Sequence, residues 1–139
     1  MKFMMIVKHP ENYSYPPKAL MDEITKLRDD AIRSGKLLGD GGLLPMAAGA
    51  TVRLSGGRVD VIDGPFTEAK EIIGGYAQFE LASKQEAVAS AVEFMELHRK
   101  YWPGWDGVCE VRQMMAHGED GVTKSPSGEV ATGSVAASR

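Results

Sequence analysis

The sequence predicts a single α+β domain in which two amphipathic helices cover one face of a mainly antiparallel sheet. Three observations lead to this fold class. Two segments carry apolar residues at helical spacing, and several shorter segments show the patterning of strands. Their order along the chain is strand, helix, strand, hairpin, strand, helix, strand. The length of 139 residues suffices for one core of ordinary size but not for two.

Composition narrows the class of function. The 16 Lys and Arg residues against 19 Asp and Glu give a net charge of −3 without a basic stripe, so nucleic acid is not an expected partner. With 43% apolar and 25% charged residues, the composition is globular. The single cysteine, Cys109, permits no internal disulfide, and no segment has the form of a membrane span or a signal peptide. We expect a cytoplasmic protein that does not bind membranes.

The first predicted elements are a strand over residues 2–8, a Pro-rich loop over 12–17 and a helix over 18–34. Both faces of the strand are apolar, which is typical of a central strand covered on each side. The helix has one apolar and one charged face, and Gly35 is suited to end it. The apolar face consists of Leu20, Met21, Ile24, Leu27 and Ala31. A short strand over 36–44, interrupted by glycines, is expected next.

The middle of the sequence predicts a β-hairpin. Residues 51–55 and 58–62 have strand patterning and flank Gly56-Gly57, which indicates a two-residue turn. In this register two apolar cross-strand pairs share one face, and a pair of opposite charges lies on the other. The three pairs are Val52 with Val61, Leu54 with Val59, and Arg53 with Asp60.

The second half of the domain repeats the order of strand, helix and strand. Residues 75–81 alternate between polar and apolar, and Ser83 with Glu86 forms a capping-box pattern that begins a second helix. The expected apolar stripe of this helix consists of Val88, Ala91, Val92, Met95 and, as the next member of the series, His98. That histidine therefore lies at the inner edge of the helix. An aromatic loop over 101–105 precedes a last strand over 108–114.

These elements match a ferredoxin-like α+β plan over residues 1–116. We expect residues 117–139 to be a flexible tail, because a segment without aromatic residues, Leu, Ile or Met buries too little apolar surface to offset its ordering entropy. Two helices on one face leave the opposite face of the first strand uncovered. Sheet-to-sheet pairing with a second copy would cover it, so we expect a C₂ homodimer.

One string points to a family. Asp63-Gly64-Pro65-Phe66, followed by Gly74-Gly75-Tyr76, resembles the signature of the YCII-related, DGPF-motif family. Supporting likeness covers most of residues 1–115, including Gly39-Asp40-Gly41-Gly42-Leu43 and Trp102-Pro103-Gly104-Trp105. The resemblance implies a ferredoxin-like protomer that forms a dimeric α+β barrel, with a cleft between the sheet and the helices.

The same resemblance implies two kinds of function. Better-studied YCII-type relatives use a His-Asp pair as an acid–base dyad, and one of them is a dehydrochlorinase of a chlorinated hydroxyquinol. Other DGPF members are linked to extracytoplasmic-function sigma factors. This chain departs from the dyad pattern, because its first helix begins Lys18-Ala19-Leu20-Met21 and has no histidine.

The DGPF turn contains the first candidate site residue. Asp63 either accepts backbone N–H bonds within the turn or stands at a strand end facing the cleft, where its carboxylate can orient or deprotonate a hydroxyl group. Glu68 and Glu71 are interpreted as surface charges, with a paired-carboxylate site formed by Asp63 and Glu68 as the alternative.

Two histidines are the other candidates. His98 either contacts exposed carbonyl groups at the C-terminus of its helix or is a neutral imidazole at the cleft margin, available as a general base. His9 directly follows the first strand, where it is either solvated or part of a ligand site at the strand end. His117 opens the tail and is not a candidate.

The remaining patterns indicate structure rather than chemistry. The histidines lack metal-ligand spacing, and no cofactor is expected. Residues 39–42 are interpreted as a bend near the cleft, since they lack the elements of a phosphate-binding loop. Cys109 lies in a strand pattern and is expected to be an inert buried thiol. Tyr101, Trp102 and Trp105 are either core or dimer contacts or a stacking platform for an aromatic ligand.

Two functions remain open at this point. The first is a cofactor-independent enzyme that uses Asp63, His98 and His9 for isomerase or lyase chemistry on a small cyclic or phenolic metabolite. The second is a non-catalytic dimeric module that binds a small molecule or a protein such as a sigma factor. The absence of a histidine in the first helix motivates the second function, which is kept as the alternative. The dimeric-barrel resemblance, with Asp63 and His98 flanking one apolar cleft, makes the enzyme the leading hypothesis.

Overall fold

The computed structural model confirms the predicted order of elements. It describes residues 1–10, 15–63, 71–116, 123–124 and 130–131, with side chains for 1–10, 15–62 and 71–116. The elements are β1 (Lys2–His9), α1 (Lys18–Arg33), β2 (Leu37–Gly42), a 3₁₀ turn (Met46–Ala48), β3 (Ala50–Ser55), β4 (Arg58–Asp63), β5 (Ile72–Glu80), α2 (Lys84–Tyr101), β6 (Val108–Gln113), β7 (Thr123–Lys124) and β8 (Val130–Ala131).

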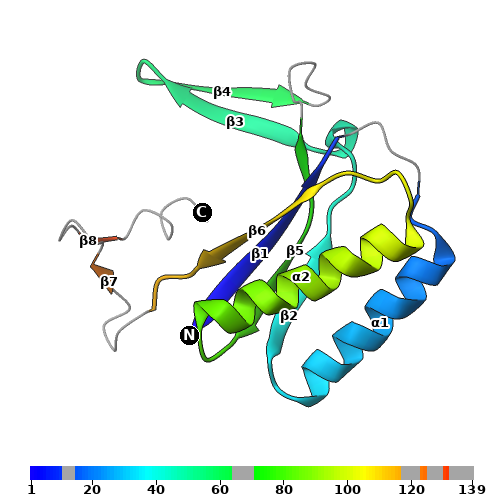
Figure 1. Cartoon of the computed structure of the whole chain (residues 1–139). Helices are drawn as coiled ribbons and strands as arrows, with labels where there is room; N and C mark the ends of the chain where they lie inside the picture. The colour runs from blue at the N-terminus through cyan, green and yellow to red at the C-terminus, as the bar shows by residue number, and fades with distance from the viewer. Residues whose placement is uncertain (11–14, 64–70, 117–122, 125–129, 132–139) are drawn as a thin grey trace.

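Four strands form one antiparallel sheet in the order β2-β5-β1-β6. With the hairpin set aside, this is the strand order of a ferredoxin-like fold, as the sequence predicts. β1 is central, in keeping with its apolar residues on both faces. Both helices lie on the same side of the sheet (Figure 1).

The core lies between the inner face of the sheet and α2. Phe3 is 1% exposed and belongs to a cluster of buried apolar residues. The other buried members are Met5, Leu81, Ala87 and Ala91. Burying these apolar side chains is the main source of stability for a domain of this size.

Helix α2 begins as predicted, and its buried face includes Ala91 and His98 of the predicted stripe but not the two valines. The Ser83 hydroxyl accepts a hydrogen bond from the Glu86 backbone N–H at 3.1 Å, which caps the helix. The residues of α2 that are buried are Ala87, Ala91 and His98. Val88 and Val92 are 42% and 55% exposed, so their place in the predicted stripe is wrong. The reason is that the small alanines let the helix approach the sheet closely, which turns the valines outward.

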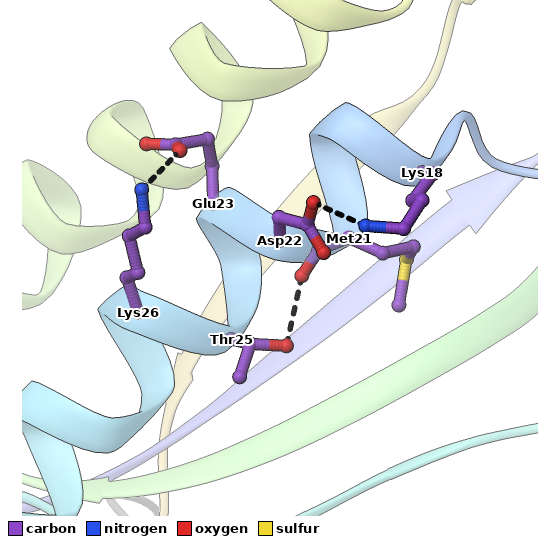
Figure 2. Close-up of polar contacts among 6 residues, drawn as sticks. All are labelled: Lys18, Met21, Asp22, Glu23, Thr25 and Lys26. Atoms are coloured by element: carbon purple, nitrogen blue, oxygen red, sulfur yellow. Dashed lines mark hydrogen bonds and ion pairs between the residues drawn. The ribbon is translucent and has the colours of Figure 1, made fainter.

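Helix α1 carries a charged outer face. Side-chain interactions one turn apart support it, as Figure 2 shows. They join Lys18 to Asp22 at 2.9 Å, Lys26 to Glu23 at 2.8 Å, and the Thr25 hydroxyl to the Met21 carbonyl at 2.8 Å. Gly35 follows the helix with a φ of 74°, so the predicted glycine cap is confirmed.

The hairpin of β3 and β4 has the predicted register. Gly56 and Gly57 have φ values of 58° and 80°, which only glycine adopts readily at both positions of a two-residue turn. The hairpin extends away from the four-stranded sheet (Figure 1). Its apolar pairs remain 65–72% exposed; they consist of Val52, Leu54, Val59 and Val61.

The predicted C-terminal tail and the domain boundary before it lie partly outside the described residues. In the segment predicted to be a tail, β7 pairs with β8, and the rest of residues 117–139 lies outside the described part. The domain boundary at residue 116 therefore stays a prediction. Among the helices of the described residues, none has the length and apolarity to cross a membrane.

Candidate functional site

A cavity of about 730 Å³ lies between the two helices and the inner face of the sheet. Its volume is typical of pockets that bind small organic molecules, and its wall is mostly apolar. Alternation along β1 directs one face of the strand into the cavity, and the helices contribute residues one turn apart. The wall includes Met5, Val7 and His9 of β1, Ile24, Leu27 and Ala31 of α1, Phe79 of β5, and Phe94 and His98 of α2.

The predicted apolar face of α1 forms the roof of this cavity. Leu20, at the start of the helix, is fully buried, whereas Ile24 and Leu27 further along are half-buried and line the cavity. The helix is thus packed tightly at Leu20, and the later residues of its apolar face border the cavity instead. A ligand in the cavity would contact the apolar side chains of α1 that no other part of the described chain covers fully.

His98 lines the cavity from the last turn of α2. Its Nδ1 atom lies 3.0 Å from the carbonyl oxygen of Phe94, which accepts the Nδ1 proton. The residue is 6% exposed and packs on the Trp105 indole, with 4.6 Å between ring centroids. Burial lowers the pKa of His98 from its ordinary value of 6.5. The imidazole is therefore neutral at pH 7, with its lone pair on Nε2.

His9 lies in the same cavity. It is the last residue of β1 and is 4% exposed, so the alternative of a solvated loop histidine is wrong. Its Nδ1 atom is 2.6 Å from the Pro10 carbonyl oxygen, and its ring centroid is 6.5 Å from that of Trp105. The residue reaches the cavity because strand pairing continues through His9 opposite Ile72, past a bulge in β5.

Two tryptophans lie beside these imidazoles. Trp102 and Trp105 stack with 5.7 Å between centroids and an interplanar angle of 21°, and both line the cavity. Their place in the cavity wall agrees with the second of the two alternatives given for these residues, a platform on which an aromatic ligand stacks. The Trp105 Nε1 atom is buried without a hydrogen-bond partner in the described part of the chain.

The position of Asp63 is described only for the backbone. It is the last residue of β4 and pairs with Ala50. Its side chain and residues 64–70 lie outside the described residues, and with them the predicted pairing of Asp63 with Glu68. The structure therefore brings His9 and His98 together, while the distance from either to the Asp63 carboxylate is not described. Glu71 is exposed, as expected of a surface charge.

An ion pair at the cavity was missed by the sequence reasoning. Arg28 of α1 donates from Nε to Asp40 of β2 at 2.8 Å, and both residues line the cavity. This bond and the Asp40 charge raise the pKa of Arg28. One signal is in the sequence, because Arg28 follows Ile24 by one helical turn. The place of Asp40, opposite the cavity residue Ala77, comes only from the strand pairing. Residues 39–42 are part of strand β2 rather than a bend, and Asp40 to Gly42 do border the cavity.

Cys109 of β6 also borders the cavity. Burial raises the pKa of its thiol, which keeps the sulfur protonated and unreactive at neutral pH. This agrees with the expected inert thiol. In the described residues, no three side chains of His, Cys, Asp or Glu converge as metal ligands.

The fold and the cavity together define a class: a ferredoxin-like α+β domain with an aromatic-lined, ligand-sized cavity under its helices and two imidazoles in the wall. The sequence model of the YCII-related domain family matches residues 1–94, which is more than half of the chain. The chain therefore belongs to this family. The uncharacterized protein R00369 of Rhizobium meliloti (strain 1021) is similar at 36% identity over 69 residues, which are 50% of this chain and 56% of that protein. The matched region thus covers little more than half of this relative.

Proposed function

We propose that this YCII-related protein is a cofactor-independent enzyme that moves a proton on a small cyclic or phenolic metabolite, in a reaction of the isomerase or lyase type. The observation that carries the proposal is the neutral, buried imidazole of His98 in the wall of an apolar, aromatic-lined cavity. A general base requires an unprotonated acceptor nitrogen, and a planar ring fits between aromatic walls. The single free cysteine is in keeping with a cytoplasmic location.

The proposed step begins with transfer of a proton from the bound ring to Nε2 of His98. The electron pair of the broken C–H or O–H bond then delocalises over the ring. An isomerisation is completed when the proton returns to another carbon, and a lyase reaction when the electron pair expels an anionic leaving group from the adjacent carbon. His9 contributes a second imidazole in the same cavity, which contacts an oxygen atom of the ligand. Asp63 has the role of orienting a hydroxyl group of the ligand.

Replacing His98 with glutamine is expected to slow proton exchange on a bound ring by about 100-fold or more, the usual contribution of a general base. The measurement is deuterium incorporation in D₂O, followed by proton NMR across a panel of phenols and cyclic ketones. In the wild-type protein, the rate should rise with pH to a plateau, and the midpoint of the rise should lie below pH 6.5, because burial lowers the pKa of His98 and the base works unprotonated.

Arg99→Gln is the matched control for His98→Gln. Arg99 is the next residue of α2, is exposed, and pairs with Glu96 away from the cavity. This variant should exchange at the wild-type rate. Unchanged exchange in both His98→Gln and His9→Gln would rule out the proposed roles of the two histidines.

A second function is favoured by the exposed hairpin. Its apolar face, defined by Val52, Leu54, Val59 and Val61, is 65–72% exposed, and an isolated two-stranded hairpin is only marginally stable in water. Met4 and Ile6 alternate with the buried Phe3 and Met5, so they lie on the outer face of the main sheet, where both are only half-buried. Both helices cover the other face (Figure 1). We propose that a second copy covers these surfaces reciprocally and that the protein acts as a homodimeric binding module.

Leu54→Lys tests this dimer. A charge in the middle of the apolar face should cost about 2 kcal/mol or more at the interface, which raises the dimer dissociation constant roughly 30-fold. Light scattering after size exclusion measures the change. Ser55→Lys, one residue further and on the opposite face of the hairpin, should leave the dimer intact. A wild-type protein that is monomeric at tens of micromolar contradicts the proposal.

A further inference from the structure

The guanidinium of Arg28 is arranged to hold a second group besides Asp40. A guanidinium has five N–H donors in a planar fork, and Asp40 accepts from Nε at 2.8 Å. Within the described residues Asp40 is the polar partner of Arg28, and it contacts only Nε, so the two terminal amino groups keep their donors. The side chain is 47% exposed at the cavity, where a ligand can reach those donors.

Among the described residues, the cavity wall has two basic side chains, Arg28 and Lys36, and three carboxylates, Asp30, Asp40 and Glu93. Of the two basic side chains, Arg28 has the planar fork that matches a carboxylate. Lys36 also lines the cavity but pairs with Glu86 at 3.4 Å. Asp30 lines it as well and pairs with Arg33. The two parallel N–H groups at the tip of an arginine match the two oxygens of a carboxylate. Asp40 fixes the plane of the guanidinium from the side and is thus a positioning residue.

The ion pair and the histidines lie at different ends of the cavity. Asp40 pairs with Ala77 and Ala77 with Met5, so Asp40 is about 10 Å from β1 across the sheet. His9 follows Met5 by four residues, or about 13 Å along the strand. A ligand that reaches both ends is elongated, with its ring beside the histidines and tryptophans and its second polar group at Arg28.

We propose that the ligand is an aromatic carboxylic acid, whose ring lies beside His98 and Trp105 and whose carboxylate binds the terminal amino groups of Arg28. This inference rests on the proposed function, since it concerns the same cavity, and it adds the charge and length of the ligand. The carboxylate anchors the ring so that its reacting atom meets Nε2 of His98.

The test compares two probes, 3-(4-hydroxyphenyl)propanoate and its neutral amide. The chain has two tryptophans, and both line the cavity, so quenching of their fluorescence reports binding there. The wild-type protein should bind the acid at least about 10-fold more tightly than the amide, the usual worth of hydrogen bonds to a charged group. Arg28→Gln should remove this preference and Arg28→Lys should restore part of it. Arg33→Gln, an exposed arginine on the same helix, should leave it unchanged.

The outcomes separate this inference from the proposed function. Equal affinity for the acid and the amide, a preference that survives Arg28→Gln, or no binding of either probe at millimolar concentration each overturns the carboxylate site. Such a result leaves the loss of proton exchange in His98→Gln as the independent measure of catalysis. Conversely, an Arg28-dependent preference with unchanged exchange in His98→Gln supports the acid-binding site and contradicts the catalytic role.

Discussion

Replacing Phe3 with alanine is expected to lower the free energy of unfolding by about 3–5 kcal/mol, a large part of the roughly 5–15 kcal/mol that a domain of this kind has. Phe3 is 1% exposed and lies in the core cluster with Ala87 and Ala91 of α2. Its removal leaves a cavity that the surrounding sheet and helix cannot fully close. Urea unfolding followed by circular dichroism measures the loss.

Met4→Ala is the matched control for Phe3→Ala. Met4 is the next residue of β1, faces the outer side of the sheet and is only half-buried, so its loss should cost about 1 kcal/mol. Because α2 carries His98, the Phe3 variant should also bind the aromatic probes more weakly at temperatures where it is still folded. Similar losses in the two variants would show that the core is not centred on Phe3.

Replacing Gly74 with alanine is expected to displace the imidazole of His9. A Cβ atom at position 74 would lie 2.1 Å from Nε2 and 2.5 Å from Cδ2 of His9, far inside van der Waals contact. The ring must turn away and give up its hydrogen bond to Pro10, at a cost of about 1–3 kcal/mol for overpacking. Nitrogen-15 NMR of the histidine side chains reports the change at His9 directly, and urea unfolding gives its cost.

Gly39→Ala is the control for Gly74→Ala. Gly39 lies in β2 of the same sheet, and a Cβ there meets no atom within 4 Å. Its unfolding free energy should therefore change by no more than about 0.5 kcal/mol, with the His9 signals unaltered. Wild-type His9 signals in Gly74→Ala would show that the glycine does not position the imidazole.

The elements of secondary structure could be predicted because their causes are local. The charged and apolar faces of residues 18–34, the Ser83 cap and the Gly56-Gly57 turn each act within a few residues of sequence. For the same reason the hairpin register is correct pair by pair. The buried face of α2 was predicted only in part: Ala91 and His98 are buried as expected, but packing against the sheet buries Ala87 and leaves Val88 and Val92 exposed.

The candidate site could be predicted only in part. The helical spacing placed His98 at the inner edge of α2, and the structure confirms its burial. His9 was left between two alternatives, because its burial depends on strand pairing beyond the bulge in β5. Arg28 and Asp40 lie on elements separated by the turn after α1, and no prediction from the sequence linked them. Their ion pair exists only once α1 is laid over β2.

The sequence by itself determined the kinds and order of the elements and the family signature around residues 63–66, because periodicity, capping and turn residues act at short range. The tertiary structure alone decided that two histidines, two tryptophans and an Arg–Asp pair surround one cavity. That outcome depends on how far α1 stands from the sheet and which face α2 presents. Both are set by the packing of side chains far apart along the chain, which local patterns do not encode.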